Sequence, residues 1–154
     1  MYLVKSSFIY LLLVLLATNC QESESLVGTW DSQYLKTTIN TYHNGDSTIS
    51  TDANPTNYQK VIGLKTARVK FNVDGTYIEH YIRIDGSVAY SQQGYWFIRG
   101  DTVVTAVYKP LKSQAVYRYH MEIYRDSAVF TSLMDYDKDG LEDDEFWGVS
   151  KRID

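Results

Sequence analysis

Two patterns of hydrophobic and polar positions divide this chain of 154 residues. Residues 8–16 form an unbroken apolar run that follows Lys5 near the N-terminus. From residue 26 onward, apolar and polar residues alternate over short segments that are rich in Tyr, Val, Ile and Thr. Such alternation is typical of β-strands with one buried face, and no long segment has the period of a helix. The sequence therefore predicts a leader followed by an all-β domain.

Turn-forming dipeptides set the limits of the predicted strands. Asn44-Gly45, Asp74-Gly75 and Asp85-Gly86 accept the positive φ angles of tight hairpins, and Gly100-Asp101 and Asp126-Ser127 mark two further turns. They predict eight or nine antiparallel strands, with one of the first three segments not a separate strand: 28–36, 38–43, 46–52, 67–73, 76–84, 87–99, 102–109, 115–125, 128–134 and 145–152. An up-and-down meander of this length is expected to form a sandwich or to close into a barrel of about 8–9 strands. Closure is favoured because it removes the edge strands.

The hairpin at Asp74-Gly75 predicts which side chains face the core. If these two residues form a two-residue turn, Phe71 pairs with Ile78 and Val69 pairs with His80. The core face is then Val69, Phe71, Val73, Ile78 and Ile82, and the outer face is Lys70, Asn72, Glu79 and Arg83 with Tyr77 and Tyr81. His80 is the polar exception on the inner face, either as a hydrogen-bonded core histidine or as a ligand contact. His80, Ile82 and Trp96 are the candidate cavity residues.

Three small or polar residues, 17–19, separate the apolar run from Cys20, the one cysteine of the chain. The run is about half as long as the roughly 20 residues that a transmembrane helix needs, so it predicts a secretory signal. A cysteine at the end of such a signal resembles a bacterial lipoprotein signal, in which the thiol is acylated and the cysteine becomes the new N-terminal residue. The resemblance implies a signal peptide over 1–19, a lipidated Cys20 with an acidic tether over 20–25, and a domain over 26–154. The alternative is an ordinary secretory signal with a leftover cysteine.

Composition and charge limit the partners of the domain. The net charge of the chain is −4 at pH 7, and removal of the leader takes away Lys5 as well. An acidic domain is a poor partner for nucleic acid, which is bound through Lys and Arg. With Cys20 acylated, no thiol remains for a disulfide, a metal site or a nucleophile. The lipid would hold the protein on a membrane of the bacterial cell envelope, at the outer membrane or the cell surface.

The first predicted strand carries the motif Gly28-Thr29-Trp30, and this Gly-X-Trp resembles the lipocalin and wider calycin family. Residues 71–77 and 94–103 are similar to hairpins of small bacterial lipocalin-like lipoproteins. The resemblance implies a barrel whose closed end is plugged by Trp30, with a basic side chain of the last strand across its ring. Arg152 is the expected partner, because guanidinium stacks well on indole. Nitrobindin-like and fatty-acid-binding barrels open similarly, and Trp30 could also be an ordinary core aromatic.

The segment between the last two predicted strands holds seven acidic residues within positions 135–145. Its D-x-D-x-D-G start matches a calcium loop, but position 12 of an EF-hand is Phe146 here instead of Glu. The spacing resembles calcium loops set between strands in extracellular modules. The expected ligands are Asp135, Asp137, Asp139 and Asp143, with the backbone carbonyl of Leu141 and with Glu145 as a possible extra. Hard oxygen ligands favour calcium, in a structural role, and the alternative is a solvated acidic turn.

Catalytic motifs are lacking in the sequence. Gly45-Asp46-Ser47 is explained as part of a turn, and His43, His80 and His120 have no metal-ligand spacing. The sequence therefore predicts a non-catalytic protein without catalytic residues, which binds a small, largely apolar ligand inside the barrel. The alternative is a surface module with a packed barrel that binds a glycan or a protein through residues 37–51 and 52–58.

Overall fold

The computed structural model of the protein describes residues 25–42, 45, 47–110 and 115–154. The predicted signal peptide, Cys20 and most of the acidic tether lie outside the described residues. Within the described ranges, no helix combines the length and apolar character that a membrane-crossing helix requires.

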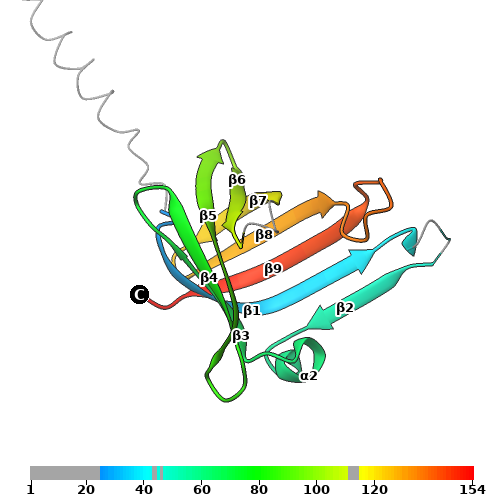
Figure 1. Ribbon diagram of the computed structural model, residues 1–154, viewed down its shortest axis with the longest axis horizontal. Coiled ribbons are helices and arrows are strands. Elements are labelled where there is room, and N and C mark those ends of the chain that lie inside the picture. The colour runs from blue at the N-terminus through cyan, green and yellow to red at the C-terminus, as the bar shows by residue number, and fades with distance from the viewer. Residues whose placement is uncertain (1–24, 43–44, 46, 111–114) are drawn as a thin grey trace, which may run out of the picture.

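Nine antiparallel strands and one short helix make up the described chain (Figure 1). Their bounds are β1 Gly28–Ile39, β2 Ile49–Ala53, α2 Tyr58–Ile62, β3 Thr66–Phe71, β4 Thr76–Ile82, β5 Val88–Arg99, β6 Thr102–Lys109, β7 Val116–Tyr124, β8 Ser127–Met134 and β9 Asp144–Arg152. The predicted segments 28–36 and 38–43 are one strand, β1. The all-β fold and the strand count are confirmed.

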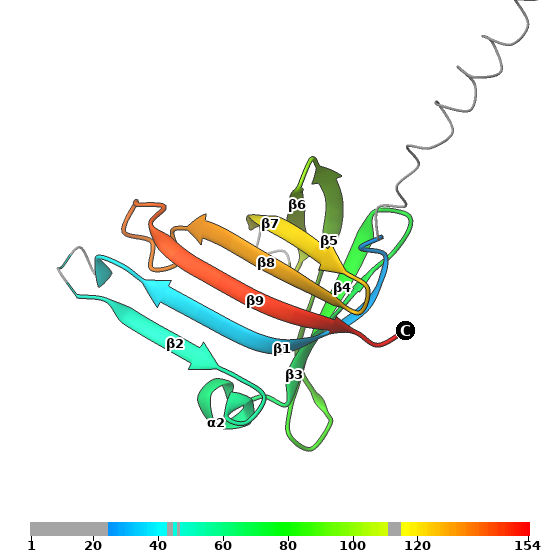
Figure 2. The same cartoon turned by 180° about the vertical axis from the view of Figure 1, so that it is seen from behind.

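The sheet closes through β1. Its first residues, Gly28–Asp31, pair with β3, whereas Leu35–Ile39 pair with β2, and β9 lies along the other edge of β1 over most of its length. Strands β1 and β3 to β9 therefore form a closed eight-stranded antiparallel barrel, and β2 is an extra strand beside the second half of β1 (Figure 2). Of the described strands, those of the barrel have both edges paired, which is the expected benefit of closure.

Trp30 lies at the closed end of this barrel. Its ring is fully buried among Leu26, Phe71, Val103 and other core residues, and its Nε1 donates a hydrogen bond to the carbonyl of Leu26 at 2.9 Å. Of the two cations on the last strand, Arg152 is the one whose guanidinium lies over the indole, with Cζ 4.3 Å from the ring centroid.

Arg152 also ties the chain entering β1 to the end of β9. Its Nη1 donates to the carbonyl of Val27 at 2.8 Å and its Nη2 donates to the carbonyl of Ser25. Gly28 is required beside it, because a Cβ there would lie 2.8 Å from Nη1 at a φ of 138°. The glycine of Gly-X-Trp thus leaves room for the arginine that covers the tryptophan.

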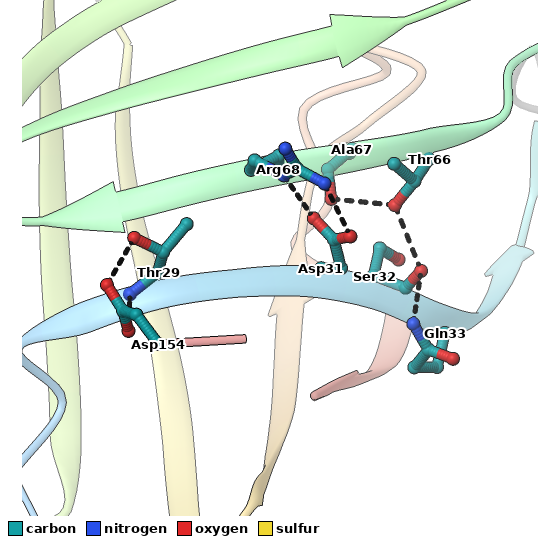
Figure 3. A network of polar contacts seen from close by, with 8 residues as sticks. All are labelled: Thr29, Asp31, Ser32, Gln33, Thr66, Ala67, Arg68 and Asp154. Carbon is teal, nitrogen blue, oxygen red and sulfur yellow. Dashed lines mark hydrogen bonds and ion pairs between the residues drawn. The ribbon is translucent and has the colours of Figure 1, made fainter. Parts of the chain in front are cut away.

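Polar pairs join neighbouring strands on the outside of the closed end (Figure 3). Arg68 of β3 forms a two-pronged ion pair with Asp31 of β1, at 2.6 and 2.9 Å. The backbone N and the hydroxyl of Thr29 donate to the carboxylate of Asp154 at 2.7 and 2.6 Å. The hydrogen bond to the Asp31 carboxylate raises the pKa of Arg68.

The predicted register of the β3–β4 hairpin is wrong by one residue. Phe71 pairs with Tyr77, and Val69 pairs with Glu79, because the turn holds three residues, Val73 to Gly75, and not two. Gly75 has a φ of 81°, which is the left-handed residue that such a three-residue loop requires. Since a shift of one residue exchanges the two faces of a strand, Tyr77, Glu79 and Tyr81 point inward. His80 and Ile82 point outward, and Val73 is 88% exposed.

Helix α2 is a short element that the sequence pattern did not predict. It ends at Gly63, which has a φ of 75° and donates to the carbonyl of Gln59. Its buried residue is Tyr58, whose hydroxyl lies 3.2 Å from the hydroxyl of Ser32 on β1. The helix is next to β2, where β2 and β3 leave β1 in different directions (Figure 1).

Candidate functional site

The barrel contains a half-open cavity of about 370 Å³. Its wall is mainly aromatic and aliphatic, and eight of its lining residues are aromatic: Phe71, Tyr77, Tyr81, Tyr117, Tyr119, Phe130, Tyr136 and Phe146. Of the described residues that line the cavity, none is Lys, Arg or His, and Glu79 is the one carboxylic acid. The cavity is therefore an apolar chamber with a single acidic group.

Glu79 is held in place by two hydrogen-bond donors. Its Oε2 accepts a hydrogen bond from Nε2 of Gln92, which is opposite it on β5, at 2.5 Å, and the Tyr81 hydroxyl donates to the same carboxylate. Burial raises the pKa of Glu79 above its ordinary value, and the two donors only partly offset this effect. The carboxyl is thus fixed in orientation and biased toward its neutral form.

The tyrosines around Glu79 are neutral rings with hydroxyl groups. Burial and the nearby Glu79 raise the pKa of Tyr77 to about 12, and the same two causes raise the pKa of Tyr81. Burial also raises the pKa of Tyr119 well above its ordinary value. The Tyr77 oxygen is buried, and the Thr105 hydroxyl is its polar neighbour. A hydroxyl oxygen can accept more than one hydrogen bond, so this oxygen is also suited to a polar group of a ligand.

Gly94 makes room for the inward Tyr77 ring. It is opposite Tyr77 on β5, and a Cβ there would lie 2.4 Å from Cε1 of Tyr77 and 2.2 Å from the carbonyl oxygen of Ala106. A larger residue at position 94 would push the ring out of its place. A glycine opposite Tyr77 is consistent with an inward Tyr77 ring, and the predicted two-residue turn at Asp74-Gly75 did not take this glycine into account.

None of the three cavity residues expected from the sequence lines the cavity. His80 is on the outer face, where its Nδ1 lies 2.6 Å from the hydroxyl of Ser91, and Ile82 is on the same face. Trp96 packs edge-on against Phe71, with ring centroids 5.3 Å apart, and its Nε1 donates to the carbonyl of Asn72 at 3.0 Å. Trp96 thus supports the core that underlies the cavity. The corrected register explains the positions of His80 and Ile82.

The acidic loop between β8 and β9 lies at the end of these strands that is away from the C-terminus (Figure 1). The backbone N of Asp139 donates to the carboxylates of Asp135 and Asp137 at 3.0 and 3.1 Å, and the N of Gly140 donates to Asp135 at 3.0 Å. The loop therefore turns around the carboxylate of Asp135. Its residue Tyr136 also lines the cavity, so the loop forms part of the cavity wall.

Asp144 joins this loop to the end of β1. It is fully buried, and it accepts hydrogen bonds from the backbone N of Asn40 at 2.9 Å and from that of Tyr136 at 2.6 Å. Carboxylate oxygens of Asp135, Asp137 and Asp144 lie within 4.8 Å of one another, which makes them the candidate metal cluster of the described chain. The D-x-D-x-D-G spacing does not predict Asp144 as a ligand, because that position of the motif carries none.

The other expected ligands lie around this cluster. Asp139 and Asp143 accept hydrogen bonds from the hydroxyl of Thr41, at 2.9 and 3.2 Å, and Oδ1 of Asp143 is buried without a partner among the described residues. Leu141 is 49% exposed, and Glu145 lies on β9 as an exposed residue. The structure thus brings together Asp135 and Asp137 of the expected set.

The strands run in sequence order around a closed antiparallel barrel, and this architecture is lipocalin-like. No protein-family model and no curated protein matches the chain. Among solved structures, the chain is similar to a lipocalin-like protein from Bacteroides uniformis, with 11% identity and a TM-score of 0.47 over 83% of this chain and 98% of that one. It is also similar to an uncharacterized protein from Bacteroides eggerthii, with 12% identity and a TM-score of 0.48 over 84% and 100% of the two chains.

We predict that the stability of the Glu79→Gln variant relative to the wild type increases as the pH rises. The pKa of Glu79 is raised above its ordinary value of 4.5, so the folded barrel holds the proton more tightly than the unfolded chain does. The stability that this adds is fully present below the ordinary value and is lost as the pH rises through the raised pKa. Glutamine stays neutral, so the melting temperature of the variant minus that of the wild type should increase by a few degrees between about pH 4 and about pH 8.

Asp85→Asn in the β4–β5 turn is a control with the opposite sign. Hydrogen bonds from Ser87 hold the pKa of Asp85 below its ordinary value, so the stability it adds is present at higher pH and is lost on acidification. The melting temperature of this variant minus that of the wild type should become more negative as the pH rises. Equal slopes for the two variants would contradict the assignment of Glu79 as a buried acid.

Proposed function

We propose that this protein is a non-catalytic carrier that binds a small, largely apolar ligand inside its barrel. The observation that carries the proposal is the cavity of about 370 Å³, whose wall is mainly aromatic and aliphatic. A pocket with such a wall and few polar groups is typical of small-molecule sites. A module that uses only its surface would need no such space, because protein interiors are otherwise packed with few voids.

Filling the cavity should abolish binding of a neutral apolar probe. Ala67 lines the cavity, so Ala67→Trp places an indole inside it. We expect this variant to bind N-phenyl-1-naphthylamine at least about tenfold more weakly than the wild type, as measured by the rise in probe fluorescence on titration.

Val116→Trp is the matched control, because Val116 is 52% exposed on the outside of β7. This variant should bind the probe as the wild type does. Equal binding by all three proteins would place the probe on the surface, and it would favour the interaction module over the carrier.

We also propose that the loop between β8 and β9 binds one calcium ion in a structural role. In support, carboxylate oxygens of Asp135, Asp137 and Asp144 lie within 4.8 Å of one another, and Oδ1 of Asp143 in the same loop is buried without a partner among the described residues. Seven acidic residues in a short segment repel one another unless a cation or solvent intervenes. Asp144 already accepts hydrogen bonds from the backbone N of Asn40 and of Tyr136, and these bonds would hold its carboxylate in place as a ligand.

Calcium at about 1 to 10 mM should raise the melting temperature by a few degrees, in line with the affinity of about 10⁻⁴ to 10⁻³ M that is usual for extracellular modules. Asp137→Asn should remove most of this increase in melting temperature. Asp101→Asn, in the exposed turn between β5 and β6, should keep it. An unchanged melting temperature of the wild type would mean that the loop is a solvated acidic turn.

We further propose that Cys20 carries a lipid that anchors the barrel to the outer membrane or cell surface of a bacterial envelope. The support is the apolar run of residues 8–16 with a cysteine after it. Cys20→Ser should abolish incorporation of labelled palmitate and shift the protein from the detergent phase to the aqueous phase of a Triton X-114 extraction. Unlabelled wild-type protein in the aqueous phase would indicate an ordinary secretory signal.

A further inference from the structure

The charges of the cavity wall limit the chemistry of the ligand. Among the described lining residues, Glu79 is the one carboxylic acid, and there is no Lys, Arg or His to pair with an anion. A carboxylate ligand, such as a fatty acid, would be buried without a counter-charge and beside an acid. Burial of an unpaired charge costs several kcal/mol or more, so this cavity disfavours the fatty acids that its apolar wall would otherwise suit.

We propose that the ligand is an amphiphile whose polar head is a protonated amine, held by the Glu79 carboxylate within the surrounding tyrosines. This inference rests on the proposed carrier function and names the ligand class. An ammonium group offers donors and needs acceptors, and the cavity supplies them. The apolar part of the ligand would lie against Val103, Phe130 and the other apolar lining residues.

The carboxylate of Glu79 has free acceptor positions. A carboxylate offers about four lone-pair sites, and Gln92 and Tyr81 account for two hydrogen bonds to Glu79. Both donors fix the group from its own wall of the barrel, β4 and β5, and they leave sites for a donor from the ligand. The buried Tyr77 oxygen, which has Thr105 as its polar neighbour and can accept a further hydrogen bond, is a second acceptor on the same strand.

The rings around Glu79 suit a cation. The titratable groups whose charge interacts with Glu79 are Tyr58 of α2, Tyr77 and Tyr81 of β4, and Tyr117 and Tyr119 of β7. All are tyrosines, and four of them, all but Tyr58, line the cavity, where an aromatic ring can attract an ammonium group that is out of water. Glu79 is costly to ionise in the empty cavity because of its burial, and an ammonium group would remove this cost by pairing with the carboxylate.

Three probes with one tail and different heads test the inference: octylamine, octan-1-ol and octanoate. Calorimetric titration of the barrel, residues 25–154, should give at least tenfold tighter binding of the amine than of the alcohol, with octanoate weakest. This segment contains every strand of the closed barrel and the whole cavity wall. Glu79→Gln should reduce amine binding to the level of the alcohol and leave alcohol binding within about twofold. Glu122→Gln, an exposed change on the outer face of β7, should leave all three affinities unchanged.

The outcomes separate this inference from the carrier function. If octanol and the naphthylamine probe bind but the amine has no advantage, or if Glu79→Gln keeps the advantage, the amine inference is overturned and the carrier stands. Tighter binding of octanoate than of octylamine overturns it as well. If none of the three octyl probes binds and N-phenyl-1-naphthylamine does not bind either, the proposed carrier function is wrong. The affinities of the wild-type barrel for octylamine, octan-1-ol and octanoate test the inference even if the Glu79→Gln variant does not fold.

Discussion

The interior of this barrel depends on the register of the β3–β4 hairpin. Gly75 in the left-handed conformation closes a three-residue loop, and its carbonyl accepts a hydrogen bond from the backbone N of Trp96 on β5 at 2.8 Å. Asp74 supports the loop by accepting hydrogen bonds from the backbone N and the hydroxyl of Thr76 at 2.9 and 2.7 Å. A slip of one residue would place His80 inside and Glu79 outside, so these few contacts decide that the cavity is acidic.

Burial of Glu79 is tolerated because the strands around it supply donors and space. Gln92 is directly opposite on β5 and donates to the carboxylate, while Gly94 leaves room for the Tyr77 ring two residues farther on. The cost of an acid in an apolar chamber falls on the empty protein, and a suitable ligand would relieve it. Groups that destabilise a free protein and are satisfied by a ligand are a common feature of binding sites.

The fold could be predicted from the sequence much further than the site could. Alternation of apolar residues and the turn dipeptides are local signals, and they gave the strands and the meander. Asp74-Gly75 is compatible with a two-residue and with a three-residue loop, and the choice depends on contacts with β5 that are distant in sequence. The contact of Asp144 with the end of β1 could not be predicted for a similar reason, because its partner there, Asn40, is 104 residues away. Helix α2 has five residues, too few for a helical period to be recognised.

Strand β9 connects the two ends of the molecule. At the closed end Arg152 covers Trp30, and at the other end the buried Asp144 holds both β1 and the acidic loop. Both contacts bind β9 to β1, the pair that closes the barrel. An ion bound beside Asp144 would therefore act on the closure of the barrel and, through Tyr136, on the cavity wall. Because Tyr136 belongs to the loop as well as to the wall, order in the loop and the shape of the cavity cannot vary independently.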